Sequence, residues 1–179
     1  MTAHVALLRG INVGGKHMLP MKQLVEVFED LGCTEVTTYI QSGNVVFRAK
    51  VTPARQIAEA VSGEIARRFH FQVPVLLRRP SELREVLARN PFLKADTDTK
   101  MLHVGFLATK PSAAKVRSLD PDRSPPDRFE LHGREIYFCC PNGVARTKLT
   151  NQYFDTRLET ICTFRNWATV QKLVEMTAA

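Results

Sequence analysis

The first 80 residues alternate short strand-like runs with amphipathic helical segments, and this alternation limits the folds open to the chain more than any other feature. Residues 4–9 form an apolar run that is closed by a glycine, which is typical of a buried strand. Residues 21–31 place their apolar side chains on one stripe of a helix, and Gly32 is placed to end that helix. The segment therefore predicts a strand followed by a helix that packs on it.

Two more strands and a second helix follow before a last strand. Residues 35–41 and 45–48 are rich in β-branched and aromatic residues, and the turn between them predicts a hairpin. A helix is expected after Pro53, because apolar residues recur there at every fourth position. Residues 73–78 form another apolar strand. The order strand, helix, strand, strand, helix, strand predicts a split βαββαβ, ferredoxin-like arrangement over residues 1–80.

Residues 81–179 are expected to form a second α+β half that is related to the first but less complete. Its expected elements are a helix capped by Ser81, a strand at 102–108, a helix from Ser112, an exposed loop at 120–128, a hairpin at 129–139, and two helices near 152–162 and 167–176. The fourth strand is missing from this pattern. The fold class is therefore α+β, with domains at 1–80 and 81–179.

The strand order of a split βαββαβ sheet brings two distant polar loops together. The expected order is fourth, first, third, second, with all neighbours antiparallel. The first and second strands then point the same way, so the loop at 9–16 and the turn at 41–44 lie at one edge. The first helix also begins there, and its N-terminus offers unpaired N–H groups and a partial positive charge.

The residue types at this edge suit an anion such as a phosphate or a carboxylate. Glycines let the backbone approach a ligand closely, two cations supply charge, and neutral side chains supply donors and acceptors. The candidate ligand-binding residues are Arg9, Gly10, Asn12, Gly14, Gly15, Lys16, Gln41, Ser42 and Asn44. The spacing fits neither a Walker loop nor a dinucleotide fingerprint. The alternative is that the glycines serve a tight turn, residues 42–44 form a plain hairpin, and Arg9 pairs with a surface carboxylate.

Four segments of the chain carry a resemblance to a known family. They are Leu7–Lys16, Thr38–Phe47, Ala145–Leu149 and Thr163–Val170. These segments resemble a bacterial family known as domain of unknown function 1697, with Thr147 where the family usually has serine. The resemblance spans nearly the whole chain and implies an α+β fold and no established activity. It also implies that the polar residues of these segments belong to one site.

The two C-terminal segments add positive charge. Asn166 is a good N-cap for the last helix and Trp167 opens the apolar stripe of that helix, so both have structural explanations. No structural role in the neighbouring sequence explains Arg146, Lys148 or Arg165. Our hypothesis is that these three residues bring further positive charge toward the site at 9–16.

Composition narrows the classes of function. Lys and Arg number 25 against 18 Asp and Glu, and the formal charge of +7 is spread along the chain and favours anionic partners. The N-terminus lacks the pattern of a signal peptide, and no apolar stretch is long enough for a membrane helix. The four cysteines and five histidines lack metal-ligand spacing. We therefore expect a cytoplasmic protein without a metal or cofactor and without a membrane partner.

The expected function is the binding of a small anionic ligand, of the phosphate or nucleotide type, at the edge formed by residues 9–16 and 41–44. A nucleic-acid-binding protein is the alternative, with weaker support, because the strands offer Tyr39 and Phe47 but no aromatic-rich RNA-binding string. A metal-independent transferase that uses Arg and Lys as clamps is a further alternative, since acidic residues are absent from all four segments. A structural or interaction protein without a small ligand is the last.

Overall fold

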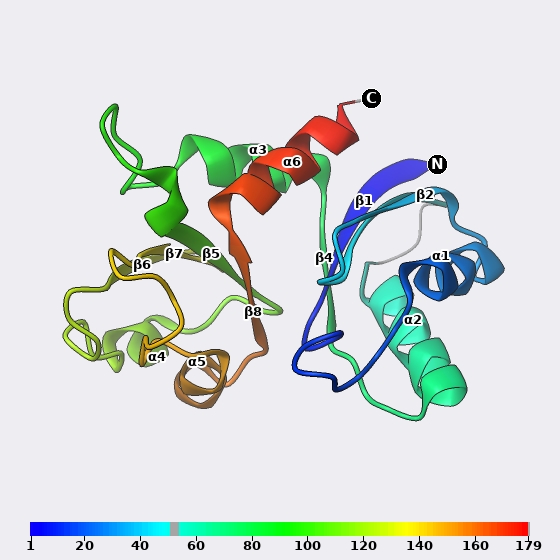
Figure 1. The fold of residues 1–179 in the computed structure, drawn as a ribbon, viewed down its shortest axis with the longest axis horizontal. Helices are drawn as coiled ribbons and strands as arrows, with labels where there is room; N and C mark the ends of the chain where they lie inside the picture. Colours follow the sequence, from blue (N-terminus) through cyan, green and yellow to red (C-terminus); the bar gives the residue numbers. More distant parts are fainter. Residues whose placement is uncertain (51–53, 179) are drawn as a thin grey trace. The chain divides into compact units, whose positions relative to one another are not determined.

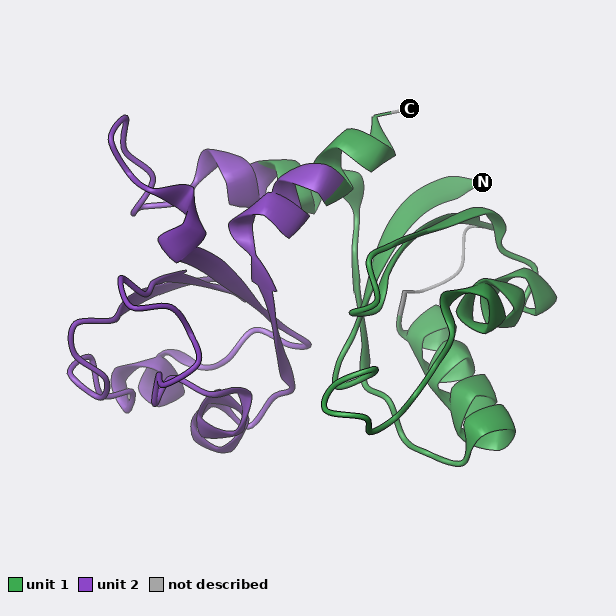
Figure 2. Cartoon of the chain, in the orientation of Figure 1, with its two compact units in different colours: residues 1–84, 173–179 green, residues 85–172 purple. Residues whose placement is uncertain are grey.

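The computed structural model describes residues 1–50 and 54–178, which form two compact units (Figures 1 and 2). The first unit consists of residues 1–84 with 173–179, and the second consists of residues 85–172. Each unit is a mixed α+β structure with one four-stranded antiparallel sheet.

The sheet of the first unit has the strand order β2-β3-β1-β4, which is the order predicted from the sequence. All neighbouring strands in it are antiparallel. The second predicted helix is present, although Pro53 itself lies outside the described residues. In chain order the elements are β1 (Thr2–Leu8), α1 (Met21–Asp30), β2 (Thr34–Tyr39), β3 (Asn44–Ala49), α2 (Ala54–Phe69) and β4 (Val75–Arg78).

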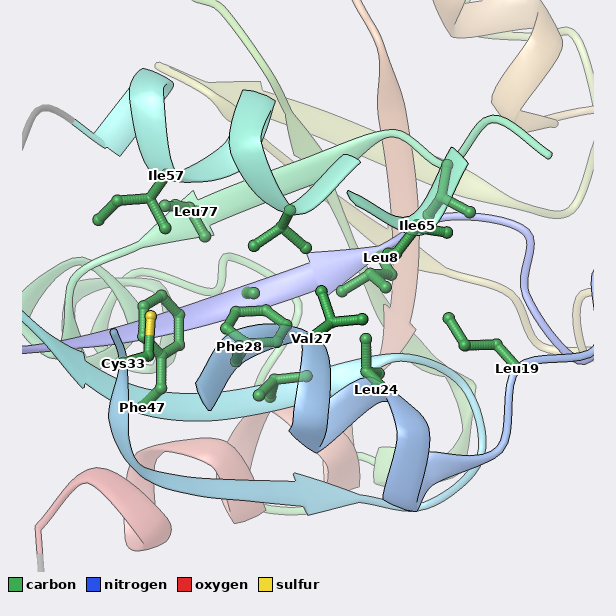
Figure 3. Close-up of a cluster of buried hydrophobic side chains, with 14 of the residues drawn as sticks. Leu8, Leu19, Leu24, Val27, Phe28, Cys33, Phe47, Ile57, Ile65 and Leu77 are labelled. Atoms are coloured by element: carbon green, nitrogen blue, oxygen red, sulfur yellow. The ribbon is translucent and has the colours of Figure 1, made fainter. Parts of the chain in front are cut away.

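Helices α1 and α2 cover one face of this sheet, and a hydrophobic core fills the space between the two layers (Figure 3). Leu8 from β1 and Phe47 from β3 enter the core from the sheet. Alternate side chains of each strand point to the same face, and these two point to the face that the helices cover. Phe28 enters from α1, and its ring centroid lies 4.9 Å from that of Phe47. From α2 the core receives Ile57 and Ile65. Burial of each side chain of this size contributes about 1.5–3 kcal/mol to folding.

The end of α1 is set by Gly32, as its sequence predicts. Gly32 has a φ of +81°. Its N–H donates to the Glu29 carbonyl at 2.9 Å, and the Cys33 N–H donates to the Phe28 carbonyl at 3.0 Å. This pair of hydrogen bonds is the Schellman motif, in which a left-handed glycine closes the helix and turns the chain toward the next strand.

The sheet of the second unit has the order β6-β7-β5-β8, which repeats the order of the first. The prediction that its fourth strand is missing is wrong. The strand β8 pairs antiparallel with β5, from Leu107 opposite Cys162 to His103 opposite Asn166. The remaining elements are α3 (Pro80–Ala88), the 3-10 turn η1 (Thr99–Met101), β5 (Leu102–Leu107), α4 (Ala113–Arg117), β6 (Arg128–His132), β7 (Glu135–Cys139), α5 (Asn151–Leu158), β8 (Cys162–Asn166) and α6 (Trp167–Thr177).

The fourth strand is not predicted from the sequence because the helix before it ends earlier than expected. Helix α5 ends at Leu158, and Glu159 follows with a φ of +52°, in the left-handed region that stops a helix. Cys162, predicted to lie at the end of that helix, instead begins β8. The strand has five residues between two helices, which is too short for a clear alternation to emerge.

The second sheet has its own core, on the face that carries α4 and α5. Phe138 from β7 and Phe164 from β8 both pack against Phe154 from α5. The Phe138 and Phe164 ring centroids are 4.8 Å apart. Gly105 in β5 leaves room for them, because a Cβ at that position would lie 3.0 Å from the Phe138 ring.

The sequence predicts caps at Ser81 and Asn166; the second prediction is confirmed, and Ser112 is a further cap. Ser112 accepts a hydrogen bond from an N–H in the first turn of α4 at 3.3 Å. Asn166 accepts one from the Thr169 N–H at 2.8 Å at the start of α6. Ser81 is not the cap of α3, because that helix begins one residue earlier at Pro80. Proline is favoured at the first helical position, where its missing N–H costs nothing.

Candidate functional site

The segment after β1 folds back on itself as a small hairpin. Val13 and Lys16 form an antiparallel bridge, in which the Lys16 N–H donates to the Val13 carbonyl at 3.0 Å. Gly14 and Gly15 lie between them with φ angles of +57° and +72°. A type I′ turn requires positive φ at both central residues, which glycine adopts without strain. The turn therefore explains these two glycines without a ligand.

The side chain of Asn12 fastens this hairpin to the turn between β2 and β3. Its Nδ2 donates to the Leu19 carbonyl at 2.9 Å and to the Gln41 carbonyl at 2.8 Å. Its Oδ1 accepts a hydrogen bond from the Leu19 N–H at 2.7 Å. Because both amide hydrogens are used inside the protein, Asn12 positions the two loops and leaves no donor for a ligand.

The turn itself is held by Asn44, which is fully buried. The Asn44 Nδ2 donates to the Tyr39 carbonyl at 3.1 Å and to the Ser42 Oγ at 2.9 Å. The Gly43 carbonyl accepts a hydrogen bond from the Leu8 N–H at 2.8 Å, which joins the turn to the end of β1. A Cβ at residue 43 would lie 2.7 Å from the Leu8 Cβ, so only glycine fits there.

These contacts place residues 9–16 and 41–44 together at one end of the first sheet. Arg9 is half-buried and Lys16 is exposed. Residues 1–25 and 36–58 contain no Asp or Glu, so the segments that build this edge bring cations without carboxylates. A surface of this kind favours an anion.

Three apolar side chains at the same edge are exposed to solvent. The exposed fractions are 65% for Val13, 60% for Met18 and 50% for Ile40. Ile40 also has a φ of +50°, a conformation that costs a β-branched residue about 1–2 kcal/mol. Backbone strain and exposed apolar side chains both concentrate at binding sites.

The structure adds His17, which is not among the ligand-binding residues predicted from the sequence. Its ring stacks on that of Phe71 with 4.7 Å between centroids, and its Nδ1 lies 3.0 Å from the Gly10 carbonyl oxygen. Phe71 belongs to the connection between α2 and β4, so no local pattern could reveal the pair. The two contacts fix the base of the hairpin.

The three C-terminal cations lie in the second unit. Arg146 and Lys148 are exposed in the connection between β7 and α5. Arg165 lies in β8 with 7% of its surface exposed, and its Nη1 donates to the Thr163 Oγ1 at 2.9 Å and to the Phe164 carbonyl at 2.8 Å. Burial lowers the pKa of Arg165 to about 10. The participation of these three residues in the site at 9–16 stays a prediction.

The described residues hold no group of three His, Cys, Asp or Glu side chains that could bind a metal ion. The four cysteines are free and buried, and burial raises the pKa of Cys140 to about 12. A thiol with that pKa stays protonated at neutral pH and is a poor nucleophile. In the part of the chain that the structure describes, the helices are too short or too polar to cross a membrane.

Two four-stranded antiparallel sheets of one strand order, each packed against helices, define a mixed α+β protein with two similarly built units. The structure is similar to that of the conserved bacterial protein SP0830 from Streptococcus pneumoniae, with a TM-score of 0.73 and 24% identity over 98% of each chain, a likeness that concerns the fold alone. Residues 1–137 match the family described as Protein of unknown function (DUF1697), and the chain belongs to this family. No curated protein matches the chain.

Proposed function

We propose that the edge formed by residues 9–16 and 41–44 binds a small anionic ligand of the phosphate or nucleotide type. The observation that carries this proposal is the hydrogen bond from Asn12 to the Gln41 carbonyl, because it holds the hairpin with Lys16 against the polar turn. The backbone that carries Lys16 is held against the turn without a ligand, which supports the proposal because a preordered backbone lowers the entropic cost of binding.

The surroundings of Lys16 favour a nucleotide over a simple anion. Lys16 is the bridge partner of Val13, so an exposed apolar side chain stands beside the positive charge. Met18 and Ile40 add exposed apolar surface to the same edge. A nucleotide uses both features, since its phosphate meets the cation and its base packs on apolar side chains. Inorganic phosphate uses only the first.

The start of α1 adds to the attraction for an anion. This helix begins at Met21, directly after the hairpin, and Pro20 at its N-cap makes no side-chain hydrogen bond to the first turn. A helix N-terminus that lacks such a cap can use its N–H groups and its partial positive charge on an anion, which contributes about 0.3–1 kcal/mol.

A thermal-shift screen of mononucleotides, sugar phosphates and carboxylates tests the proposal. We expect a mononucleotide to raise the melting temperature of the wild type and to lose this effect in Lys16→Ala and in Arg9→Ala. A ligand at about 100 times its Kd stabilises the folded state by about 2.7 kcal/mol, which is a measurable shift.

The matched control is Lys50→Ala. Lys50 is exposed and follows β3 at the end of the sheet opposite to Asn44, so this variant removes the same charge from the same unit. We expect it to keep the full ligand-induced shift. A ligand that stabilises the wild type and both edge variants alike would show that it binds elsewhere.

A further inference from the structure

Two guanidinium groups of the second unit lie over the ring of Tyr153, and a third cationic residue, Lys148, is joined to one of them through its backbone. The guanidinium carbon of Arg123 lies 4.0 Å from the ring centroid, and that of Arg157 lies 5.9 Å from it. The Arg123 Nε also donates to the Lys148 backbone carbonyl at 3.0 Å, which holds the backbone of Lys148 next to Arg123. Arg123, Lys148 and Arg157 form the Tyr153 cation cluster.

The loops that carry this cluster are joined by hydrogen bonds. The Ser124 Oγ donates to the Asp127 carboxylate at 2.9 Å and accepts from the Lys148 N–H at 3.0 Å. Ser124 and Asp127 are each only 8% exposed, so the prediction of an exposed loop at 120–128 is wrong for these two residues. Leu149, next to Lys148 in the chain, is buried in the core of the second unit and anchors the second loop. The backbone that carries the cations is therefore fixed without a ligand.

The cluster has no ion-pair partner among the residues that the structure describes. Carboxylates close by in the chain are engaged otherwise: Asp120 accepts from a backbone N–H at 2.9 Å, and Asp155 accepts from another at 2.8 Å. In the first unit, by contrast, Arg55 and Arg67 pair with glutamates of their own helix. The three cations therefore form no direct ion pair within the described part of the chain, and a bound anion would supply one.

The geometry around Tyr153 distinguishes a phosphate ligand from a nucleobase. Tyr153 is 8% exposed, and its hydroxyl oxygen accepts a hydrogen bond from the Asp120 N–H at 2.9 Å, so its ring offers no platform for stacking. Guanidinium and ammonium groups, in turn, make charge-assisted hydrogen bonds to phosphate oxygens. Cations without a stacking surface contact the nucleic-acid backbone and not the bases.

We propose that the Tyr153 cation cluster binds the phosphate backbone of a nucleic-acid strand without reading its sequence. Arg146 is exposed in the same loop as Lys148 and extends the cationic surface. Cations on two loops and one helix suit successive phosphates of a strand better than a single phosphate ion. The proposal gives Arg146 and Lys148 a role other than the one predicted at residues 9–16, and Arg123 and Arg157 lie outside residues 9–16 and 41–44.

The test measures binding of a labelled oligothymidylate of about 20 nucleotides by fluorescence anisotropy between about 50 and 200 mM salt. Lys148→Ala and Arg157→Ala are the variants, since both side chains are exposed and their loss leaves the folded core intact. We expect each to weaken binding about three- to tenfold and to reduce the slope of log K against log salt by about 0.7. A mixed-sequence oligonucleotide should behave in the same way.

Arg55→Ala is the control, because it removes one positive charge from an exposed position on α2. We expect it to leave both the affinity and the salt slope unchanged. Equal weakening by Arg55→Ala would overturn the proposal, since binding would then follow net charge alone. Loss of binding in Lys16→Ala, but not in Lys148→Ala, would also overturn it and would assign the strand to the first site. If inorganic phosphate stabilised the protein and no oligonucleotide bound, the proposal would also be overturned, and the ligand of the cluster would be a simple anion.

Discussion

Gly15 and Gly43 both have positive φ angles, but they differ in what surrounds them. A Cβ at Gly15 would meet nothing within 4 Å, whereas one at Gly43 would lie 2.7 Å from the Leu8 Cβ. Gly15→Ala should therefore lower the free energy of unfolding by about 1 kcal/mol, the cost of the left-handed conformation alone. Gly43→Ala should lower it by about 3 kcal/mol, because a backbone shift is added. Urea titration of both variants measures the difference, and equal losses would show that Leu8 can move aside.

Residue types alone could identify the polar edge but not the roles of its members. The run of glycines and cations from Arg9 to Lys16 is visible in the sequence and points to a turn or an anion site. The hydrogen bonds of Asn12 are not visible, because one of their acceptors, Gln41, belongs to another loop. Asn44 likewise serves the turn and is buried. In a sequence, a polar side chain that contacts a ligand cannot be distinguished from one that holds the loops of the site in place. Only the hydrogen-bond partners separate the two roles.

At the scale of elements, the first unit was predictable because each element carries its own periodic signal. The helical stripe of α2 and the apolar run of β1 are long enough to identify, and the strand order follows from their sequence along the chain. The strand β8 was not predictable, since its five residues lie directly between α5 and α6. Its pairing with β5, and not its composition, makes it a strand.

The junction of β8 and α6 depends on one side chain. The Asn166 Oδ1 accepts a hydrogen bond from the Thr169 N–H at 2.8 Å, and Trp167, the single tryptophan of the chain, is buried next to it. Asn166→Ala should reduce the free energy of unfolding by about 1 kcal/mol, whereas Asn166→Asp keeps the cap and should stay within a few tenths of the wild type. Urea unfolding followed by tryptophan fluorescence reports directly on this junction. A loss of equal size in both variants would mean that the amide group is needed for something other than the cap.

At the scale of the whole molecule, each unit contains one histidine with a lowered pKa. In the first unit, burial of His4 is the main cause, and the nearby charge of Arg79 acts in the same direction against a smaller opposing effect of Glu82. The His4 ring stacks on Phe47 with 5.5 Å between centroids. In the second unit, burial lowers the pKa of His103, and a backbone hydrogen bond with Met101 opposes it. Both histidines are therefore neutral in the folded protein over a range where the unfolded chain is already protonated.

This difference sets the sign of the pH dependence of stability. Because the unfolded chain binds protons near pH 6.5 and the folded protein binds them only at lower pH, the free energy of unfolding falls as the pH drops through about 6.5 toward the folded pKa values. His4→Phe removes one of the two groups and keeps an aromatic ring against Phe47, so urea titrations between about pH 7.5 and 5.5 should show a shallower loss of stability than in the wild type. His70→Asn is the control, since His70 is exposed and asparagine tolerates its φ of +61°. It should keep the wild-type slope, and an unchanged slope in His4→Phe would mean that His4 takes up its proton equally in both states.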